Sequence, residues 1–270
     1  MRYKLTLEYA GTRYSGWQIQ KNARTIQGEI DRAVRRVTGR ADFELGGSGR
    51  TDAGVHALAQ VAHLDVITTL GDEVLRQRLN DDLPPDINIL RVARAPRGFH
   101  ARHQAQTRRY LYQIALRRTA FAKPYVWWVK EPLDIQRMHE AAQTFVGMRD
   151  FRSFAASDSR SRQAREDEDV EPPPSTLVLV DRLDVVESGG LLLVAIEGSH
   201  FLWRMVRRIV GVLAEVGRGR MDATDVPALL TSSSDAPARL TAPASGLFLA
   251  RVYYAGEPRD TAIEPATPIR

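Results

Sequence analysis

The sequence predicts an α+β fold of two similar α/β units, whose mixed, mainly antiparallel sheets pack side by side around a central basic cleft. The chain has 270 residues, 43% of them hydrophobic and 26% charged, which is typical of a globular protein with one or two domains. Segments with strand alternation and segments with helical periodicity follow one another along the chain. The stretch RRYLYQIAL repeats the pattern of RYKLTLEYA at the start, which indicates an internal duplication.

The first unit is expected to span residues 1–105. Apolar and polar residues alternate over 2–9, which predicts a strand. Thr25 can cap a helix over 26–37, and a mostly apolar strand is expected over 58–67. A second helix over 72–80 ends before Pro84 and Pro85, and a short strand follows over 87–92. These elements predict a mixed sheet with helices on it.

The second unit is expected to span residues 106–255. Its first strand is followed by a helix over 135–146, then by strands over 177–186 and 191–197 joined at a Ser188-Gly189-Gly190 turn. A helix over 202–216 ends at Gly217, and a last strand is expected over 247–254. The acidic, proline-rich loop over 155–175 and the tail over 256–270 are predicted to be poorly ordered and flexible.

The composition excludes several kinds of chemistry. The absence of cysteine rules out disulfides, iron-sulfur clusters and thiolate zinc sites. Among the histidines only His100 and His103 have a metal-like spacing, and with no third ligand nearby we expect them to contact phosphate or to pack. We therefore expect no metal and no cofactor. No apolar segment is long enough to span a bilayer, so we expect a cytoplasmic protein without a membrane partner.

The positive charge is unevenly distributed. The net charge is +5, yet residues 87–130 contain no Asp or Glu. A preference for arginine explains which basic residue is used but not why acids are missing. The pattern favours an anionic partner, most simply a nucleic acid. The basic residues of this stretch are Arg91, Arg94, Arg97, Arg102, Arg108, Arg109, Arg117, Arg118, Lys123 and Lys130.

The glycine-rich stretch GGSGRTDAG does not fit a nucleotide-binding loop. A phosphate loop would need glycine at position 44 and lysine at position 50, where the sequence has Glu44 and Arg50, and no helix follows. A dinucleotide fingerprint would place its third glycine at Asp52. Asp52 is then either an ordinary turn residue or a charged catalytic group. In extended backbone Arg50 would lie on the same face and keep the carboxylate ionised.

A set of motifs in a fixed order resembles the tRNA pseudouridine synthase A family. They are GWQIQ at 16–20, GRTDAGVHA at 49–57, FHAR at 99–102, RRYLY at 108–112, DFRSF at 150–154 and FLWRMVRRIVG at 201–211. The resemblance covers residues 1–255 and implies the pseudouridine synthase fold. It also implies a cofactor-free isomerisation of uridines 38, 39 and 40 in the anticodon arm of tRNA by a homodimer.

The resemblance implies roles for individual residues. Asp52 matches the catalytic aspartate, which acts either as a nucleophile at C1′ or as a base at the 2′ carbon. Arg50 matches an arginine that pairs with this carboxylate and fills the space left by the flipped base. Tyr110 matches a tyrosine that stacks on uracil and accepts the C5 proton, although by pattern alone it is a core aromatic.

Further candidates lie in the second unit. Arg207 matches an arginine that bridges to the catalytic carboxylate, and Leu247 matches an apolar position near the uracil. Arg204 and Arg208 are expected to contact phosphate or to lie on a solvated surface. Candidate substrate contacts from the basic stretch are Arg102, Arg108 and Arg109. The alternatives are a non-catalytic RNA-binding protein, a nucleosidase that hydrolyses the same bond, and a pseudouridine synthase acting on another RNA.

Overall fold

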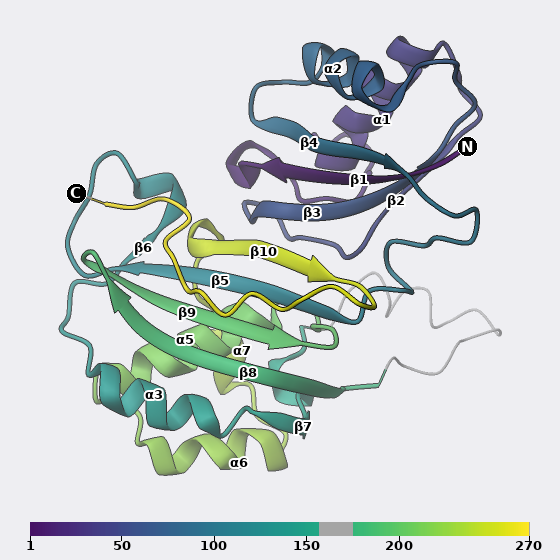
Figure 1. Ribbon diagram of the computed structural model, residues 1–270. Helices are drawn as coiled ribbons and strands as arrows, with labels where there is room; N and C mark the ends of the chain where they lie inside the picture. The colour runs from purple at the N-terminus through teal and green to yellow at the C-terminus, as the bar shows by residue number, and fades with distance from the viewer. Residues whose placement is uncertain (157–174, 270) are drawn as a thin grey trace.

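The computed structural model describes residues 1–156 and 175–269, which form two halves that share one sheet (Figure 1). The first half contains β1 (Arg2–Tyr9), α1 (Ile26–Thr38), β2 (Glu44–Gly47), β3 (His56–Asp65), α2 (Asp72–Asp82) and β4 (Ile87–Arg94). The second contains β5 (Thr107–Ala115), β6 (Trp127–Trp128), α3 (Ile135–Gln143), β7 (Gly147–Asp150), β8 (Leu177–Ser188), β9 (Leu191–Gly198), α5 (Met205–Gly217), α6 (Val226–Thr231), α7 (Ala236–Arg239) and β10 (Leu247–Tyr253). This arrangement confirms the predicted α+β class.

The last strand joins the two halves. The strand order is β4-β1-β3-β10-β5-β9-β8-β7, so β10 lies between the first half and the second. It pairs in parallel with β3, Phe248 facing His56, and antiparallel with β5, Leu249 facing Tyr110. The predicted pair of separate sheets is therefore one continuous sheet. Because β3 and β10 run in the same direction, the loops that precede them lie side by side at the same end of the strands.

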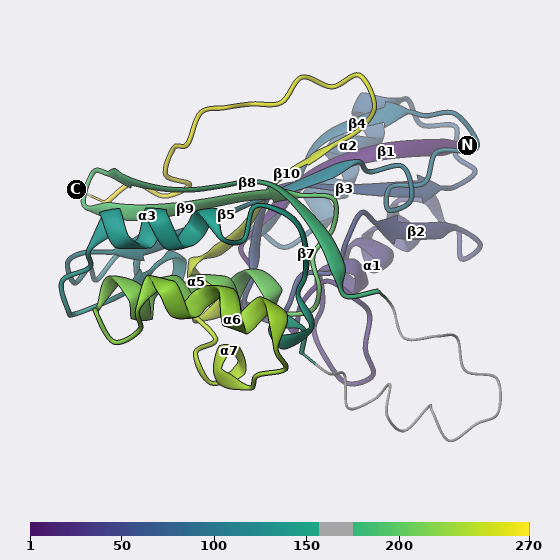
Figure 2. The ribbon, with the colours of Figure 1, turned by 90° about the horizontal axis from the view of Figure 1, so that it is seen from below.

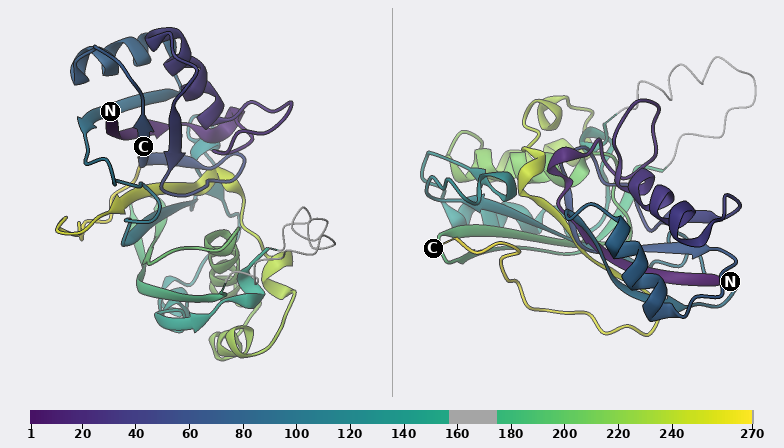
Figure 3. Two further views of the ribbon diagram at one scale, coloured as in Figure 1. Left: turned by 90° about the vertical axis from the view of Figure 1, so that its right-hand side faces the viewer. Right: turned by 90° about the horizontal axis from the view of Figure 1, so that it is seen from above.

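Helices cover one face of this sheet. In β1 every second residue is buried, and Tyr3, Leu5 and Leu7 belong to the core of the first half together with residues of α1 and α2. The core of the second half is built from β5, β8, β9, α3 and α5. Figures 2 and 3 show α3, α5 and α6 on one side of the sheet and the C-terminal tail on the other.

Local signals set the helix ends with small shifts. The Thr25 hydroxyl accepts the backbone N–H of Gly28 at 3.2 Å, and Gly39 ends α1 with φ 67°, so the predicted cap is confirmed. The helix predicted over 202–216 begins only at Met205, because Arg204 has a left-handed φ of 61°. The helix predicted over 135–146 ends at Gln143, ahead of β7.

The tail from Gly256 packs on the helix-free face, although the sequence predicts it to be flexible. Arg109 donates to the carbonyl oxygens of Asp260, at 2.6 Å, and Ala262, and Gln113 accepts the N–H of Ala266 at 2.7 Å. A cavity of about 1050 Å³ on this face is lined by residues of β1, β3, β4, β5, β10 and the tail. Residues 157–174, most of the predicted loop over 155–175, lie outside the described part.

Candidate active site

Asp52 lies in the loop between β2 and β3, at a sharp turn. The N–H of Val55 binds the carbonyl oxygen of Asp52 at 3.1 Å, and Gly54 completes the turn with φ 78°. Gly16 backs the loop so closely that a Cβ there would lie 2.5 Å from the carbonyl oxygen of Thr51. The backbone N–H of Trp17 binds the same oxygen at 3.0 Å. The GWQIQ motif therefore supports the Asp52 loop from behind.

The second half supplies a cation to this carboxylate. Nη1 of Arg207, in the first turn of α5, lies 3.6 Å from Oδ2 of Asp52. The two side chains are 15% and 21% exposed, so the pair is largely buried but still open to a substrate. Nε of Arg207 donates to the carbonyl oxygen of Ala242 at 2.7 Å, which fixes the guanidinium. The structure thus brings together two of the residues that the sequence singles out.

The electrostatics of the pair reflect this burial. Burial raises the pKa of the Asp52 carboxyl above its ordinary value, while the charges of Arg207 and Arg204 and the Trp203 side chain act in the opposite direction. Burial likewise lowers the pKa of Arg207, and the carboxylate of Asp52 opposes that shift. Arginine remains charged throughout the physiological range, so the site holds a fixed cation beside an acid that titrates.

Tyr110 lies on β5, on the helix-covered side of the sheet. It is half-buried and packs edge to face against Phe201, with ring centroids 5.2 Å apart. Burial raises the pKa of its hydroxyl well above the ordinary value, and the charges of Tyr9 and Asp52 add to this shift. Leu247 is buried at the start of β10 and pairs with Tyr112 on β5. Both residues belong to the part of the sheet that adjoins the Asp52 loop.

Arg50 does not pair with Asp52, contrary to the sequence prediction. Its side chain is exposed, and among residues 1–156 and 175–269 it forms no ion pair with a carboxylate. The prediction assumed extended backbone, whereas the chain turns at Asp52 and buries the intervening Thr51, whose hydroxyl lies 2.8 Å from that of Tyr9. Of the two arginines predicted to lie beside the carboxylate, only Arg207 does so among the described residues.

Three other predicted RNA contacts have structural roles. Arg208 is buried and donates to the carbonyl oxygen of Ser153 at 3.4 Å. Arg109 points to the opposite face, where it contacts the tail and lies 3.5 Å from Glu197. The guanidinium of Arg108 donates to four backbone carbonyls, those of Ser48, Arg102, Ala105 and Ser199. These guanidinium groups are occupied by the protein itself, so they are not available as predicted.

The two remaining candidates are exposed. Arg102 lies at the surface in the turn between β4 and β5. Arg204 lies over the ring of Trp203 with its guanidinium carbon 4.7 Å from the ring centroid. Trp203 itself is exposed, and a hydrogen bond from its side chain lowers the pKa of Asp52, against the effect of burial. Sequence reasoning passed over Trp203, although an aromatic residue next to the predicted helix start was a usable signal.

A buried polar network beneath the loop was also missed. The amide oxygen of Gln60 accepts the Ser48 hydroxyl at 2.7 Å, and its nitrogen donates to the carbonyl of Gly49 at 3.1 Å and to the hydroxyl of Tyr9 at 3.4 Å. Gln60 is completely buried in β3. A buried amide keeps its conformation only when its polar atoms are paired, so Gln60 fixes the backbone just before Asp52. In the sequence it stands among apolar residues, which was the available signal.

His56 anchors the exit of the loop. Its Nδ1 accepts the N–H of Gly11 at 3.1 Å, so its Nε2 carries the proton and donates to the carbonyl of Pro124 at 3.1 Å. The ring stacks on Phe248 of β10 with centroids 4.8 Å apart. Burial lowers the pKa of this imidazole, because the charged form is poorly solvated there.

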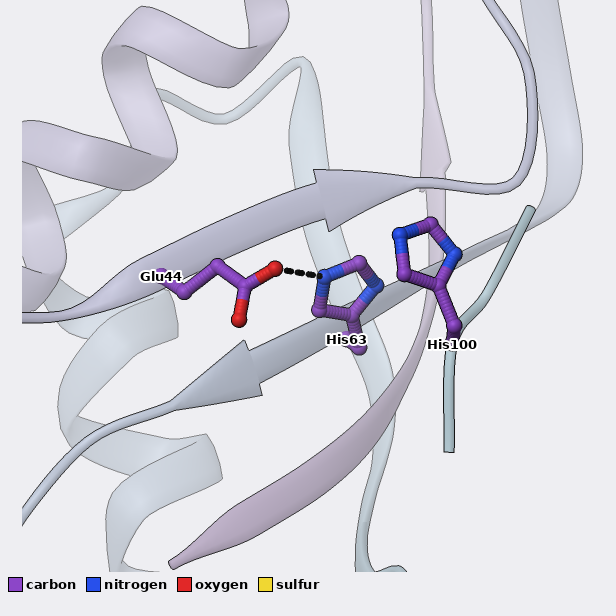
Figure 4. A group of neighbouring side chains, drawn as sticks. All are labelled: Glu44, His63 and His100. Atoms are coloured by element: carbon purple, nitrogen blue, oxygen red, sulfur yellow. Dashed lines mark hydrogen bonds and ion pairs between the residues drawn. The ribbon is translucent and has the colours of Figure 1, made fainter. Parts of the chain in front are cut away.

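The pair His100 and His103 does have further ligand types nearby. Glu44, His63 and His100 bring their ligand atoms within 4.8 Å of one another (Figure 4). Nδ1 of His63 accepts the N–H of Ala101, and Nε2 lies 3.0 Å from a Glu44 oxygen. Metal binding through Nε2 would move the proton to Nδ1, where it would face another N–H. The cluster is therefore a structural hydrogen-bond network that links β2, β3 and the turn at His100. The ring of His103 packs on that of His100, with the ring centroids 4.1 Å apart.

The chain as a whole matches a known family of proteins. The family model described as tRNA pseudouridine synthase matches residues 6–104 and 141–255. The chain therefore belongs to this family, and it is an isomerase that acts on tRNA.

Individual relatives agree with this assignment over nearly their whole length. Proteins named tRNA pseudouridine synthase A from Brucella ovis, Brucella melitensis and Brucella abortus are each 41% identical over 259 residues. The alignment covers 94% of this chain and 98% of each relative. Within the residues that the structure describes, no helix combines the length and the apolar character needed to cross a membrane.

Proposed function

We propose that this isomerase converts uridines 38, 39 and 40 in the anticodon arm of tRNA to pseudouridine, with Asp52 as its catalytic carboxylate. The observation that carries the proposal is the 3.6 Å contact between Asp52 and Arg207 in a largely buried site. The relatives' name, tRNA pseudouridine synthase A, supports the same activity. We also propose that the working enzyme is a homodimer, which the mass of the protein in solution tests directly.

The reaction needs only one carboxylate. Asp52 either forms a bond to C1′ or removes the 2′ proton, and in both cases the N1–C1′ bond breaks and its electron pair leaves with the uracil. The uracil anion is delocalised, so it needs no acid to leave, unlike the alkoxide that glycosidases must protonate. The uracil then turns and bonds to C1′ through C5, which breaks the bond between Asp52 and C1′ or, in the other pathway, is accompanied by return of the proton from Asp52 to the 2′ carbon. C5 loses a proton and N1 gains one, so no co-reactant is consumed.

Ionised Asp52 is required in either pathway. Burial disfavours the anion, and Arg207 offsets this cost by placing a positive charge beside it. Partial burial also keeps water from C1′, where hydrolysis would compete with reattachment of the base. Arg207 is thus a positioning and electrostatic residue for the reactive carboxylate.

Tyr110 and Arg50 take distinct roles. The raised pKa of Tyr110 keeps its phenol protonated, which suits stacking on the uracil better than removing the C5 proton. Arg50 is exposed in the same loop as Asp52, so its planar guanidinium is available to fill the space that a flipped base leaves. Leu247 offers an apolar contact from the start of β10.

The Asp52→Asn variant tests the proposal. We expect it to lose more than about a thousandfold in conversion, measured as tritium release from tRNA labelled at uridine C5, because the reactive group is removed. Its Kd for tRNA should stay within about twofold, since Asn keeps the shape of the side chain. Asp42→Asn, which changes an exposed aspartate, is the matched control.

The alternatives give different results. A variant Asp52→Asn that still turns over would refute the assignment of the carboxylate. Free uracil released from tRNA by the wild type would indicate a nucleosidase. A wild type that binds tRNA but releases no tritium would indicate a non-catalytic RNA-binding protein. Mapping pseudouridine in tRNA from cells that lack and then regain the gene tests the positions, and a loss of pseudouridine confined to positions outside 38–40 would reject the anticodon arm.

A further inference from the structure

A surface that combines exposed aromatic rings with exposed cations lies between β5 and α3. We call residues 116–130 the 116–130 loop. Phe121 is 97% exposed and Trp128 is 41% exposed. Both lie among cations that are also exposed, namely Arg117, Arg118, Lys123 and Lys130. A phenylalanine ring exposed to this degree offers a flat apolar face to a binding partner.

The base of the loop is firmly held. Ala122 and Val126 are buried in a small apolar cluster with Leu111 and Leu193. The N–H of Tyr125 binds the carbonyl of Ala122 at 2.8 Å. Phe121 is therefore presented outward next to an anchored turn.

Hydrogen bonds join the 116–130 loop to the start of β3, which follows the Asp52 loop, and to the start of β10. Pro124 accepts a hydrogen bond from His56, the first residue of β3, and Val126 accepts one from the Ser245 hydroxyl at 3.1 Å, just before β10. Figure 1 shows this loop at the end of β5, on the side of the sheet where β3 and β10 begin. A tRNA bound at Asp52 could therefore extend to it.

The charge of the loop fits an anionic partner. No acidic residue occurs between positions 87 and 130. The next acid, Glu131, is paired with Arg220 at 2.7 Å and with Arg218 at 3.4 Å. Arg118 lies over the ring of Trp128, with its guanidinium carbon 5.8 Å from the ring centroid. Cations interleaved with aromatic rings are the combination that binds unpaired nucleotides.

We propose that the 116–130 loop is a second tRNA-contacting surface, separate from the Asp52 site. Phe121 stacks on an unpaired base, and Arg117, Arg118 and Lys123 contact backbone phosphates. The stacking is tolerant of sequence because every base has a flat face, while the phosphate contacts supply affinity that depends on salt. The surface takes no part in the chemistry, so it acts on tRNA binding alone.

The variant Phe121→Ala tests the stacking contact. We expect Kd for tRNA to rise about tenfold, the effect of losing one stacked base, with kcat at saturating tRNA unchanged. Met148→Ala removes an exposed side chain from the edge strand β7 and should leave Kd unchanged. Replacing Arg117, Arg118 and Lys123 together by Gln should reduce the slope of log K against log salt by about two. A matched control, Arg40→Gln, changes one exposed cation elsewhere.

The possible outcomes separate this proposal from its rivals. An unchanged Kd for Phe121→Ala, with an unchanged salt slope for the triple variant, would overturn it. A change in protein mass with unaltered tRNA affinity would assign the loop to a protein interface and would also overturn it. Failure of the proposed function would instead appear as tritium release that persists in Asp52→Asn, so the two failures are distinguishable.

Discussion

Removal of the cation at position 207 should change the pH dependence of the reaction. The variant Arg207→Gln keeps a planar side chain that can donate to Ala242 but loses the charge that lies 3.6 Å from the Asp52 carboxylate. Burial already raises the pKa of Asp52, and Arg207 is the first cause that opposes the rise. Without it, the pKa of Asp52 rises further and less of the carboxylate is ionised at neutral pH.

The magnitude follows from the distance. Two unit charges 3.6 Å apart interact by about 1 kcal/mol in bulk water and by about 5 kcal/mol at an effective dielectric constant of 20. Asp52 is 21% exposed, so solvent screens part of this interaction. Carboxyl groups beside an arginine have their pKa lowered by about 1 to 3 units. We expect the acid limb of the pH profile to move toward higher pH by about that amount.

The assay is kcat/KM for tritium release as a function of pH, because this parameter reports the pKa of the free enzyme. Activity should fall as pH drops through the raised pKa of Asp52, and it should recover part of its loss at high pH. Arg207→Lys keeps the charge and should leave the limb close to its wild-type position. Arg204→Gln removes a cation with a smaller effect on Asp52 and should move the limb less. If Arg207→Gln lowers kcat/KM equally at every pH and the acid limb of the profile does not move, this electrostatic role is refuted.

Two further predictions concern the support of the loop. Gln60→Leu should lower kcat more than it raises KM, and it should cost about 1 to 3 kcal/mol of unfolding free energy because the Ser48 hydroxyl loses its partner. The control is Gln77→Leu, at an exposed position of α2. An unchanged kcat in Gln60→Leu would contradict the role of Gln60 in supporting the Asp52 loop. The buried neutral His56 should make the fold less stable as pH falls below about 6.5, since only the unfolded chain then takes up a proton. Denaturation of His56→Gln should show a shallower pH dependence, and an identical one would refute the assignment.

Local sequence patterns account for much of the fold. Alternation predicts β1, and the Thr25 cap predicts the start of α1, because both depend on residues close in the chain. The short elements β7, α6 and α7 were not predicted, since four to six residues carry little periodicity. The position of β10 between β3 and β5 also could not be read from the sequence. It depends on pairing between residues nearly two hundred positions apart, as Phe248 with His56.

The site shows the same division between local and long-range information. Motifs single out Asp52, Tyr110 and Arg207, and the structure brings them to neighbouring elements. Of the two arginines expected beside Asp52, Arg207 lies there and Arg50 does not, because Arg50 is near only in sequence. Arg109 was expected to be a substrate contact, yet in β5 it points to the opposite face from Tyr110. Which carbonyl groups a guanidinium binds depends on three-dimensional neighbours that composition does not contain.

Arg108 explains how one site can be built from two halves. Its guanidinium binds the carbonyl of Ser48 at 3.0 Å, just before the Asp52 loop, and that of Ser199 at 2.6 Å, before α5. Burial lowers its pKa, and its side chain pairs only with carbonyl dipoles in these contacts. A cation shared between these two turns fixes the carboxylate of the first half relative to the helix that carries Arg207. Arg108 thus supports the 3.6 Å contact between Asp52 and Arg207 through hydrogen bonds made within the protein.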